Sequence, residues 1–275
     1  MDQHSSVNPG EDDLTTISDP QVVIRHNVRA NVPYLRRFGR AITGSQTRAD
    51  ICVVQLMEDL LVDPGLIEDG VTPKAALYRR FLDIMHSVPG GGGSSDVPTP
   101  LERQAYLLTT VEGFDFAQAS NVLNVSVAEL SRMIEDVQAQ LSSQAGARTL
   151  IIEDEPLIAA HLKLQVKQLG HEVIGTAPTH EQAIRKSLAN RPQLILSDVQ
   201  LADGSSGIDA VDEIQNHFDV PVIFITAYPE RLLTGKRPEP IFLITKPYVE
   251  QAVKATISQA LFLNEQARAF AMSAH

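Results

Sequence analysis

The sequence predicts a two-part protein, with an all-helical N-terminal half and a C-terminal half of alternating short strands and helices. Two observations support this division. Before residue 142, apolar residues recur at intervals of three and four, the period of an amphipathic helix. After residue 147, five short apolar runs alternate with helical segments, which predicts a parallel sheet covered by helices on both faces. The 275 residues are enough for two domains of ordinary size.

The helical half begins with apolar residues at helical spacing from Val22 to Ile42, which predict the first helix. Further helices are expected over residues 50–61 and 73–86, and a fourth is expected to open at Thr99-Pro100. No strand is expected in this half.

Two stretches of small and turn-forming residues divide the chain. Residues 88–100 contain four consecutive glycines, a composition that predicts a flexible linker because it cannot form a packed element. Residues 142–147 are also small and separate the helical pattern from the strand pattern. The expected organisation is a disordered N-terminus at 1–17, helical lobes at 18–87 and 100–142 joined by a linker at 88–99, and an α/β domain at 147–268.

The C-terminal half contains five strand and helix repeats in about 120 residues, which fits the doubly wound, flavodoxin-like fold with strand order 2-1-3-4-5. The strands are expected within residues 150–152, 173–174, 194–196, 220–225 and 241–244. The helices are expected over residues 156–169, 179–190, 207–218, weakly near Glu230, and over 249–263.

Composition narrows the class of protein. With Cys52 as the single cysteine, an intramolecular disulfide is impossible and a cysteine-based zinc site is not expected. No apolar run reaches the ~18 residues that cross a bilayer, and the acidic first twenty residues do not resemble a signal peptide, so a cytoplasmic protein is expected. The net charge is −11, and residues 1–147 carry 11 basic against 19 acidic side chains, which disfavours nucleic-acid binding.

Ionisable and hydroxyl side chains follow four of the five expected strands. The first strand ends in Glu153 and Asp154, the third in Asp198 and the fourth in Thr226, and Lys246 follows the fifth. In open α/β sheets, sites form outside the carboxyl ends of the strands, where the strand order switches. Strands 1 and 3 are neighbours in the expected order, so the three carboxylates are expected to converge.

Three carboxylates in one pocket repel one another unless cations compensate their charge. Mg²⁺ is such a cation, because it prefers oxygen ligands and retains several waters, and Lys246 adds a further positive charge. In this setting Asp198 can act as a nucleophile toward phosphorus and carry a phosphoryl group covalently. The hydroxyl of Thr226 can donate a hydrogen bond to a phosphoryl oxygen.

This pattern resembles the receiver domain of bacterial two-component response regulators over residues 148–265. Asp154, Asp198, Thr226 and Lys246 follow one another at spacings of 44, 28 and 20 residues, which fit that family. The resemblance implies that Asp198 is the phosphoacceptor, that Thr226 is a switch hydroxyl and that Lys246 precedes a cis proline. The implied Mg²⁺ ligands are Asp154, Asp198 and the backbone carbonyl of Gln200, with Glu153 acting through water.

One position departs from the common receiver pattern. Leu243 stands where an aromatic switch residue is usual, whereas the fourth strand continues into Phe224-Ile225-Thr226-Ala227-Tyr228. This segment resembles the Phe-X-Thr-Gly-X-Tyr subtype, with Ala227 where glycine is usual. Tyr228 is therefore the expected aromatic switch, and the alternative is that it packs on the following helix.

The helical half contains a basic cluster of Arg36, Arg37 and Arg40, followed by a Gly-Ser turn and a second helix. This stretch resembles region 2 of small extracytoplasmic-function sigma factors. The cluster is interpreted as a solvated helix face with ion pairs, with a contact to core RNA polymerase as the alternative.

Residues 98–141 resemble region 4 of the same sigma factors. A leading helix pair is expected over residues 98–111, followed by a helix-turn-helix. Ser126, with Glu129 three residues later, predicts a capping box at the start of its second helix.

This helix-turn-helix is not expected to read DNA. Its second helix contains one cation, Arg132, against three carboxylates, and residues 100–147 carry 2 basic and 6 acidic side chains. A recognition helix needs cationic or amide side chains, and phosphate contacts dominate DNA affinity.

A sigma-like half followed by a receiver resembles the PhyR-type general stress response regulators over about 250 residues. The resemblance implies a regulatory protein with no separate enzymatic output. A sensor histidine kinase would phosphorylate it, and its sigma-like half would then leave the receiver and capture a NepR-type anti-sigma factor. Capture would release the true sigma factor.

Three alternatives remain at this level. The first is a phosphorylation-activated transcription factor that binds DNA through the helix-turn-helix, and the second is a true sigma factor regulated in cis. The third is a degenerate receiver that serves only as a docking module.

Overall fold

The computed structural model describes residues 20–63, 65, 72–88, 100–142, 146–229, 232 and 239–273. The expected disorder at 1–17, the expected linker beyond Val88 and the expected weak helix near Glu230 lie outside these residues.

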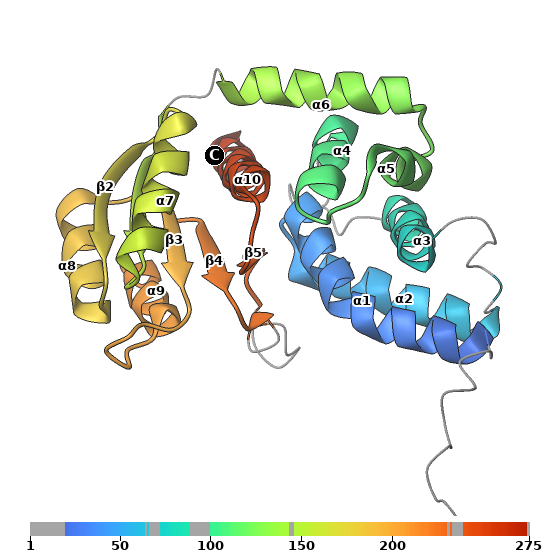
Figure 1. The fold of residues 1–275 in the computed structure, drawn as a ribbon, viewed down its shortest axis with the longest axis horizontal. Coiled ribbons are helices and arrows are strands. Elements are labelled where there is room, and N and C mark those ends of the chain that lie inside the picture. The colour runs from blue at the N-terminus through green and yellow to red at the C-terminus, as the bar shows by residue number, and fades with distance from the viewer. Residues whose placement is uncertain are drawn as a thin grey trace, which may run out of the picture.

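The N-terminal half is a bundle of six helices in the described part of the chain, and no strand precedes residue 146 there (Figure 1). The helices are α1 (Pro20–Thr43), α2 (Gln46–Val62), α3 (Pro73–Ser87), α4 (Leu101–Thr110), α5 (Phe116–Leu123) and α6 (Val127–Ser142). The first lobe, α1–α3, and the second lobe, α4–α6, share one apolar core. Where a leading helix pair was expected over residues 98–111, the chain forms the single helix α4, so that expectation is wrong.

Side-chain caps fix several helix starts. Thr72 accepts a hydrogen bond from the Ala75 amide before α3, and Pro73 occupies the first turn. The capping box expected before α6 is confirmed, because the Ser126 amide donates to Glu129 and the Glu129 amide donates to the Ser126 hydroxyl. The turn between α5 and α6 contains Asn124 in the left-handed region, φ 53°, which asparagine tolerates better than most residues.

The C-terminal half is a five-stranded parallel sheet, and its order β2-β1-β3-β4-β5 confirms the expected one. The strands are β1 (Arg148–Ile152), β2 (Glu172–Ala177), β3 (Leu194–Asp198), β4 (Val222–Thr226) and β5 (Phe242–Thr245). The helices are α7 (Pro156–Gln168), α8 (His180–Asn190), α9 (Gly207–Gln215) and α10 (Glu250–Ser273). Ile152 pairs with Ser197, so the carboxyl ends of β1 and β3 lie side by side.

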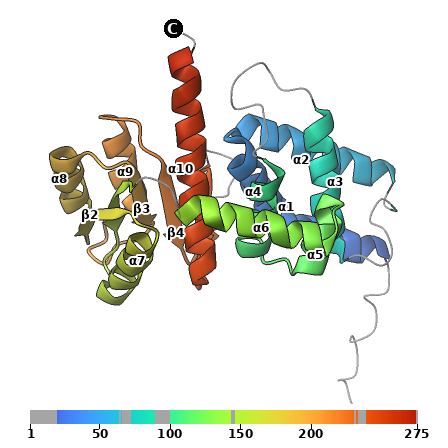
Figure 2. The same cartoon turned by 90° about the horizontal axis from the view of Figure 1, so that it is seen from above.

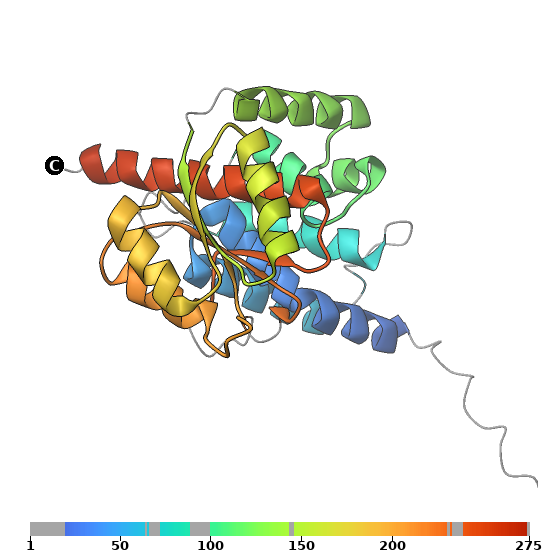
Figure 3. The same ribbon diagram turned by 60° about the vertical axis from the view of Figure 1, so that its left-hand side comes forward.

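The sheet has an apolar core on each face, because most residues of β1, β3, β4 and β5 are buried. Helices α7 and α10 cover one face, and α8 and α9 cover the other (Figures 1 and 3). Gly207 at the start of α9 permits a close approach to β3, since a Cβ there would lie 1.8 Å from the carbonyl oxygen of Asp198.

Helix α10 lies between the two halves of the molecule (Figure 2). It is longer than the expected helix at 249–263, and it packs on the sheet and also on α4. Ala255 on α10 belongs to the apolar core of the helical half. No helix in the described part of the chain combines the length and apolarity needed to cross a membrane.

Candidate phosphoacceptor site

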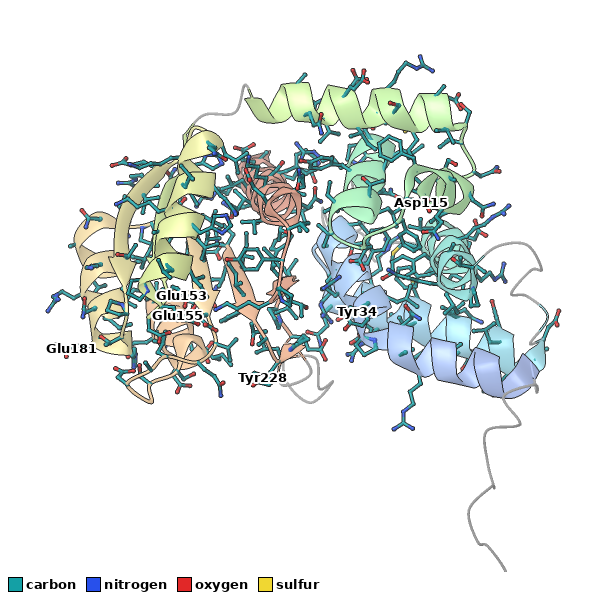
Figure 4. All side chains as sticks on the ribbon, in the orientation of Figure 1. Tyr34, Asp115, Glu153, Glu155, Glu181 and Tyr228 are labelled. Atoms are coloured by element: carbon teal, nitrogen blue, oxygen red, sulfur yellow. The ribbon has the colours of Figure 1, made fainter. Side chains whose placement is uncertain are left out.

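The structure brings the three predicted carboxylates together at the carboxyl ends of β1 and β3. Glu153, Asp154 and Asp198 each place a carboxylate oxygen within 4.8 Å of the others. Glu153 and Asp154 directly follow β1, and Asp198 is the last residue of β3. Figure 4 shows Glu153 and Tyr228 along the same edge of the sheet.

Lys246, which follows β5, joins two of these carboxylates. Its Nζ lies 2.7 Å from Asp198 Oδ2 and 3.0 Å from Glu153 Oε2. The other oxygen of Asp198 accepts a hydrogen bond from the Val199 amide at 2.5 Å. The Lys246-Pro247 peptide bond is cis, as expected.

The electrostatics of this pocket follow from burial and from the ion pairs. Burial raises the pKa of Glu153, whose side chain has no exposed surface, although the hydrogen bond from Lys246 acts in the opposite direction. Burial lowers the pKa of Lys246, but its hydrogen bonds to Asp198 and Glu153 outweigh this effect and raise the pKa overall. The pocket therefore favours a charged lysine beside carboxylates that repel one another.

The donor set fits Mg²⁺. Three converging carboxylates against one ammonium leave a formal charge of −2, and hard divalent cations prefer carboxylate and carbonyl oxygens. Gln200, the predicted carbonyl ligand, lies two residues beyond Asp198 and donates its amide to Asp198 Oδ1 at 3.3 Å.

The two predicted switch residues lie at the end of β4. Thr226 is buried, and its hydroxyl oxygen accepts a hydrogen bond from the Tyr228 amide at 3.0 Å. The Tyr228 side chain is 48% exposed, so in this conformation it is not buried against a neighbouring element. The amide of Lys246 donates to the Thr226 carbonyl at 2.7 Å, which ties the ends of β4 and β5 together.

The basic cluster of α1 forms the ion pairs that were expected, but it is not a solvated helix face, because Arg37 and Arg40 are buried. Arg40 has no exposed surface, and its guanidinium contacts Glu239 Oε2 at 2.5 Å, while Arg36 contacts the other oxygen of Glu239 at 3.1 Å. Glu239 is also buried and lies just before β5. Two arginines of the helical half thus hold one carboxylate of the α/β half.

Arg37 faces the second helical lobe instead. Its guanidinium donates to Glu112 at 2.8 Å, and the Tyr78 hydroxyl donates to the same carboxylate at 2.6 Å. Burial raises the pKa of Tyr78 well above its usual value, and the Glu112 charge acts in the same direction. The pairing of Glu112 with Arg37 and Tyr78 gave no signal in the sequence, because polar residues 75 and 34 positions away from it form no periodic pattern.

Helix α10 provides further contacts between the halves. Arg103 on α4 donates to the Ser258 hydroxyl at 3.1 Å, and its guanidinium lies 3.9 Å from the ring centroid of Phe262. The side-chain amide of Gln259 donates to the carbonyl of Ala41 at 2.9 Å. The contact between the halves therefore combines ion pairs, one of them buried, with hydrogen bonds and apolar packing.

The surface of α6 supports the expectation about DNA. Glu129, Glu135 and Asp136 are exposed on this helix beside the single cation Arg132. This helix presents more negative than positive charge to solvent, which opposes contact with a phosphate backbone.

Comparisons with known families divide the chain in the same order. Residues 28–82 match the sigma2 domain of PhyR, and residues 98–144 match the sigma-like domain of the response regulator PhyR. Residues 149–258 match the response regulator receiver domain.

Similar proteins match nearly the whole chain. The phyllosphere-induced regulator PhyR of Methylorubrum extorquens is 46% identical over 265 residues, which cover 92% of this chain and 97% of that protein. The crystal structure of the response regulator PhyR from Brucella abortus is 45% identical, with a TM-score of 0.83 over 92% of this chain and 99% of that one. The structure of the anti-anti-sigma factor PhyR from Bartonella quintana is 42% identical, with a TM-score of 0.81 over 90% of this chain and 99% of that one. Together with the sigma-like helical half and the receiver pocket described above, these matches show that the chain belongs to the PhyR family of response regulators.

Proposed function

We propose that this chain is a phosphorylation-controlled anti-anti-sigma factor. A sensor histidine kinase transfers a phosphoryl group to Asp198, so that a bond forms between phosphorus and a carboxylate oxygen while the bond to the kinase breaks. The helical half then leaves the α/β half and binds a NepR-type anti-sigma factor, which frees a sigma factor of the general stress response. The contact of Arg36 and Arg40 with Glu239 carries this proposal, because it joins the two halves and buries the Arg40 guanidinium against a carboxylate of the other half.

The residues of the pocket have different roles in phosphoryl transfer to Asp198. Lys246 already donates to Asp198, so its ammonium is placed to neutralise charge on a phosphoryl oxygen. The Thr226 hydroxyl, now an acceptor from the Tyr228 amide, can turn to donate to that oxygen. Asp154, Asp198 and the Gln200 carbonyl would hold Mg²⁺, with Glu153 reaching it through water, and bound Mg²⁺ supplies charge neutralisation for phosphoryl transfer.

The route from the pocket to the other half of the molecule is short. Movement of Thr226 and Tyr228 strains the end of β4, which the Lys246 amide links to β5. Glu239 lies at the other end of β5, where Arg36 and Arg40 hold it. A shift of β5 therefore changes the geometry of a buried ion pair, which is costly to leave incomplete.

The helical half offers a surface for a partner helix. Ile51, Val54 and Leu61 are 50%, 57% and 78% exposed along one side of α2, at helical spacing. Ile51 and Val54 lie beside Asp50 and Glu58 in a shallow groove of about 380 Å³. An apolar stripe with acidic edges suits an amphipathic helix with basic edges, which is the chemistry expected of an anti-sigma segment.

The remaining properties follow from this assignment. The chain is a regulator whose only covalent chemistry is its own phosphorylation and dephosphorylation, and it acts in the cytoplasm, where sigma factors act. DNA binding is not part of the proposed function, because the exposed surface of α6 is acidic.

The test measures binding of purified NepR from Bartonella quintana to the full chain by calorimetry. Beryllofluoride with Mg²⁺ serves as the phosphoryl mimic. We expect tight binding only with the mimic, and we expect Asp198→Ala to remove this dependence and to block labelling by acetyl phosphate. Asp209→Ala, an exposed carboxylate on α9, is the matched control and should behave like the unmodified chain.

Two outcomes would contradict the proposal. Unchanged labelling of Asp198→Ala would show that the phosphoacceptor is another residue. Retention of promoter DNA rather than NepR by the activated chain would instead favour a transcription factor.

A further inference from the structure

A hollow of about 300 Å³ lies at the amino ends of the strands, at the opposite end of the sheet from Asp198. Its lining comes from the start of β1, the turn before β3, the turn before β4 and the last part of α10. The lining includes Arg148, Arg191, Gln193, Phe218, Asp219 and Arg268. The hollow therefore gathers three guanidinium groups from three different elements.

These arginines differ from four others that the structure describes. Arg36, Arg37, Arg40 and Arg80 each contact a carboxylate. In contrast, no salt bridge to a described residue is formed by the three arginines of the hollow. In a chain of net charge −11, the hollow contains three unpaired cations and the single carboxylate of Asp219.

The backbone and one ring hold parts of this site in place. Arg191 ends α8 with φ 41°, in the left-handed region that residues other than glycine and asparagine seldom adopt. Its guanidinium lies 5.7 Å from the ring centroid of Phe218. Gln193 fixes the start of β1, because its side-chain oxygen accepts a hydrogen bond from the Arg148 amide at 3.0 Å. The positions of Arg191 and Arg148 are thus fixed by local contacts.

We propose that this hollow binds a small phosphate-bearing anion with at least two negative charges. Guanidinium groups match phosphate oxygens with two parallel N–H donors, and three such groups can surround a tetrahedral anion from different sides. A planar carboxylate has only two oxygens and would leave much of this donor capacity unused. The volume is at the lower limit of the ~300–1,000 Å³ that is usual for ligand pockets, so the ligand is small.

The experiment is calorimetric titration of the full chain with pyrophosphate, without Mg²⁺ and at fixed salt concentration. We expect saturable binding to one site, weakened at least tenfold in Arg191→Gln and in Arg268→Gln. Arg185→Gln removes an exposed arginine of α8 outside the hollow and should leave the affinity unchanged. Asp198→Ala should also leave it unchanged, so this test is independent of the phosphorylation site.

Several results would overturn the proposal. One is the absence of saturable binding, and another is an equal loss of affinity in Arg185→Gln, which would indicate general charge attraction. Acetate binding as tight as pyrophosphate binding would exclude a phosphate-selective site. Circular dichroism of each variant checks that the fold is retained, which is expected because all the substituted arginines are exposed.

Discussion

The side chain of Glu153 has no exposed surface, yet it belongs to a pocket of four charged groups. Burial raises its pKa, so ionised Glu153 depends on the nearby ammonium of Lys246. The same ammonium contacts Asp198. One lysine therefore stabilises the buried carboxylate and the proposed phosphoacceptor together, which explains why both lie beside it before any phosphoryl group arrives.

The stability of the fold depends on the protonation state of a single buried residue, His171. Its ring is buried, its Nδ1 accepts a hydrogen bond from the Ala147 amide at 3.2 Å, and burial lowers its pKa below 6.5. In the unfolded chain the ring takes up a proton at about pH 6.5, whereas the folded chain resists it. The stability contributed by neutral His171 is therefore present above pH 6.5 and is lost as the pH falls through the lower, folded pKa.

We expect His171→Asn to make the free energy of unfolding less dependent on pH between 7.5 and 5.5, because asparagine keeps an acceptor for the Ala147 amide but does not titrate. Urea unfolding at the two pH values measures this. His217→Asn, at an exposed histidine, is the control. An unaltered pH dependence in His171→Asn would show that other groups dominate acid destabilisation.

At the scale of elements, the contact between α1 and the residue before β5 decides how the halves are held together. Burial lowers the pKa of Arg40, and the charge of Glu239 acts in the opposite direction. In Glu239→Gln the buried guanidinium loses its counter-charge, and breaking a buried pair in this way costs ~3–5 kcal/mol. When the halves separate, Arg40 is exposed to water and no longer needs a counter-charge. The substitution therefore destabilises the docked arrangement of the halves more than the separated one.

We therefore expect Glu239→Gln to raise the affinity of the unphosphorylated chain for NepR by about tenfold or more, since tenfold corresponds to ~1.4 kcal/mol. Calorimetry without a phosphoryl mimic measures this. Asp59→Asn breaks the partly exposed pair with Arg80, away from the α/β half, and is the control. Unchanged affinity in Glu239→Gln would mean that the apolar and α10 contacts alone hold the halves together.

The exposed apolar stripe of helix α2 is the proposed surface for the partner helix, and it can be tested by substitution. Val54→Ser removes part of the exposed apolar stripe without altering the core, so the fold should be retained. If a partner helix covers this side chain, its loss weakens NepR binding by ~1 kcal/mol, or about fivefold. Leu188→Ser, at a half-exposed leucine on α8, is the matched control. Equal affinities in the two variants would place the partner on another face.

The elements themselves were largely predictable from the sequence. Strand order, the capping box at Ser126 and the meeting of Asp154 with Asp198 follow from periodicity, local hydrogen bonding and sheet topology. The environment of Arg40 was not predictable, because it depends on Glu239, which is 199 positions away and belongs to no motif. The local sequence pattern shows that a helix has a basic side, but it does not show which residues that side contacts.

At the scale of the whole molecule, phosphorylation is expected to change shape as well as affinity. The described contacts between the halves include one buried ion pair, one partly buried ion pair and the packing of α10 on α4. If these contacts are released, the radius of gyration rises. Small-angle X-ray scattering of the full chain should show this increase on addition of beryllofluoride and Mg²⁺, and no increase for Asp198→Ala. An unchanged radius together with NepR binding would indicate rearrangement without separation.

The arrangement of the two halves could not be predicted from the sequence, although each half could. The sequence pattern predicts an end of α10 at residue 263, whereas the helix continues to Ser273 and contacts both halves. Its contacts with α4 involve Arg103, Ser258 and Phe262, which are ordinary surface residue types when considered singly. Docking of the two halves depends on shape and charge complementarity between segments that are distant in the sequence. Such complementarity produces no periodic pattern that could be recognised in the sequence.

The pairing of Arg36 and Arg40 with Glu239 also limits how such proteins can be recombined. A receiver transplanted from a relative that lacks an acid at this position would leave the buried Arg40 without its counter-charge and Arg36 with Asp50 alone. The hybrid would contain two correctly folded parts and still signal constitutively. We therefore expect that a functional exchange of receivers has to transfer α1 and the segment before β5 together.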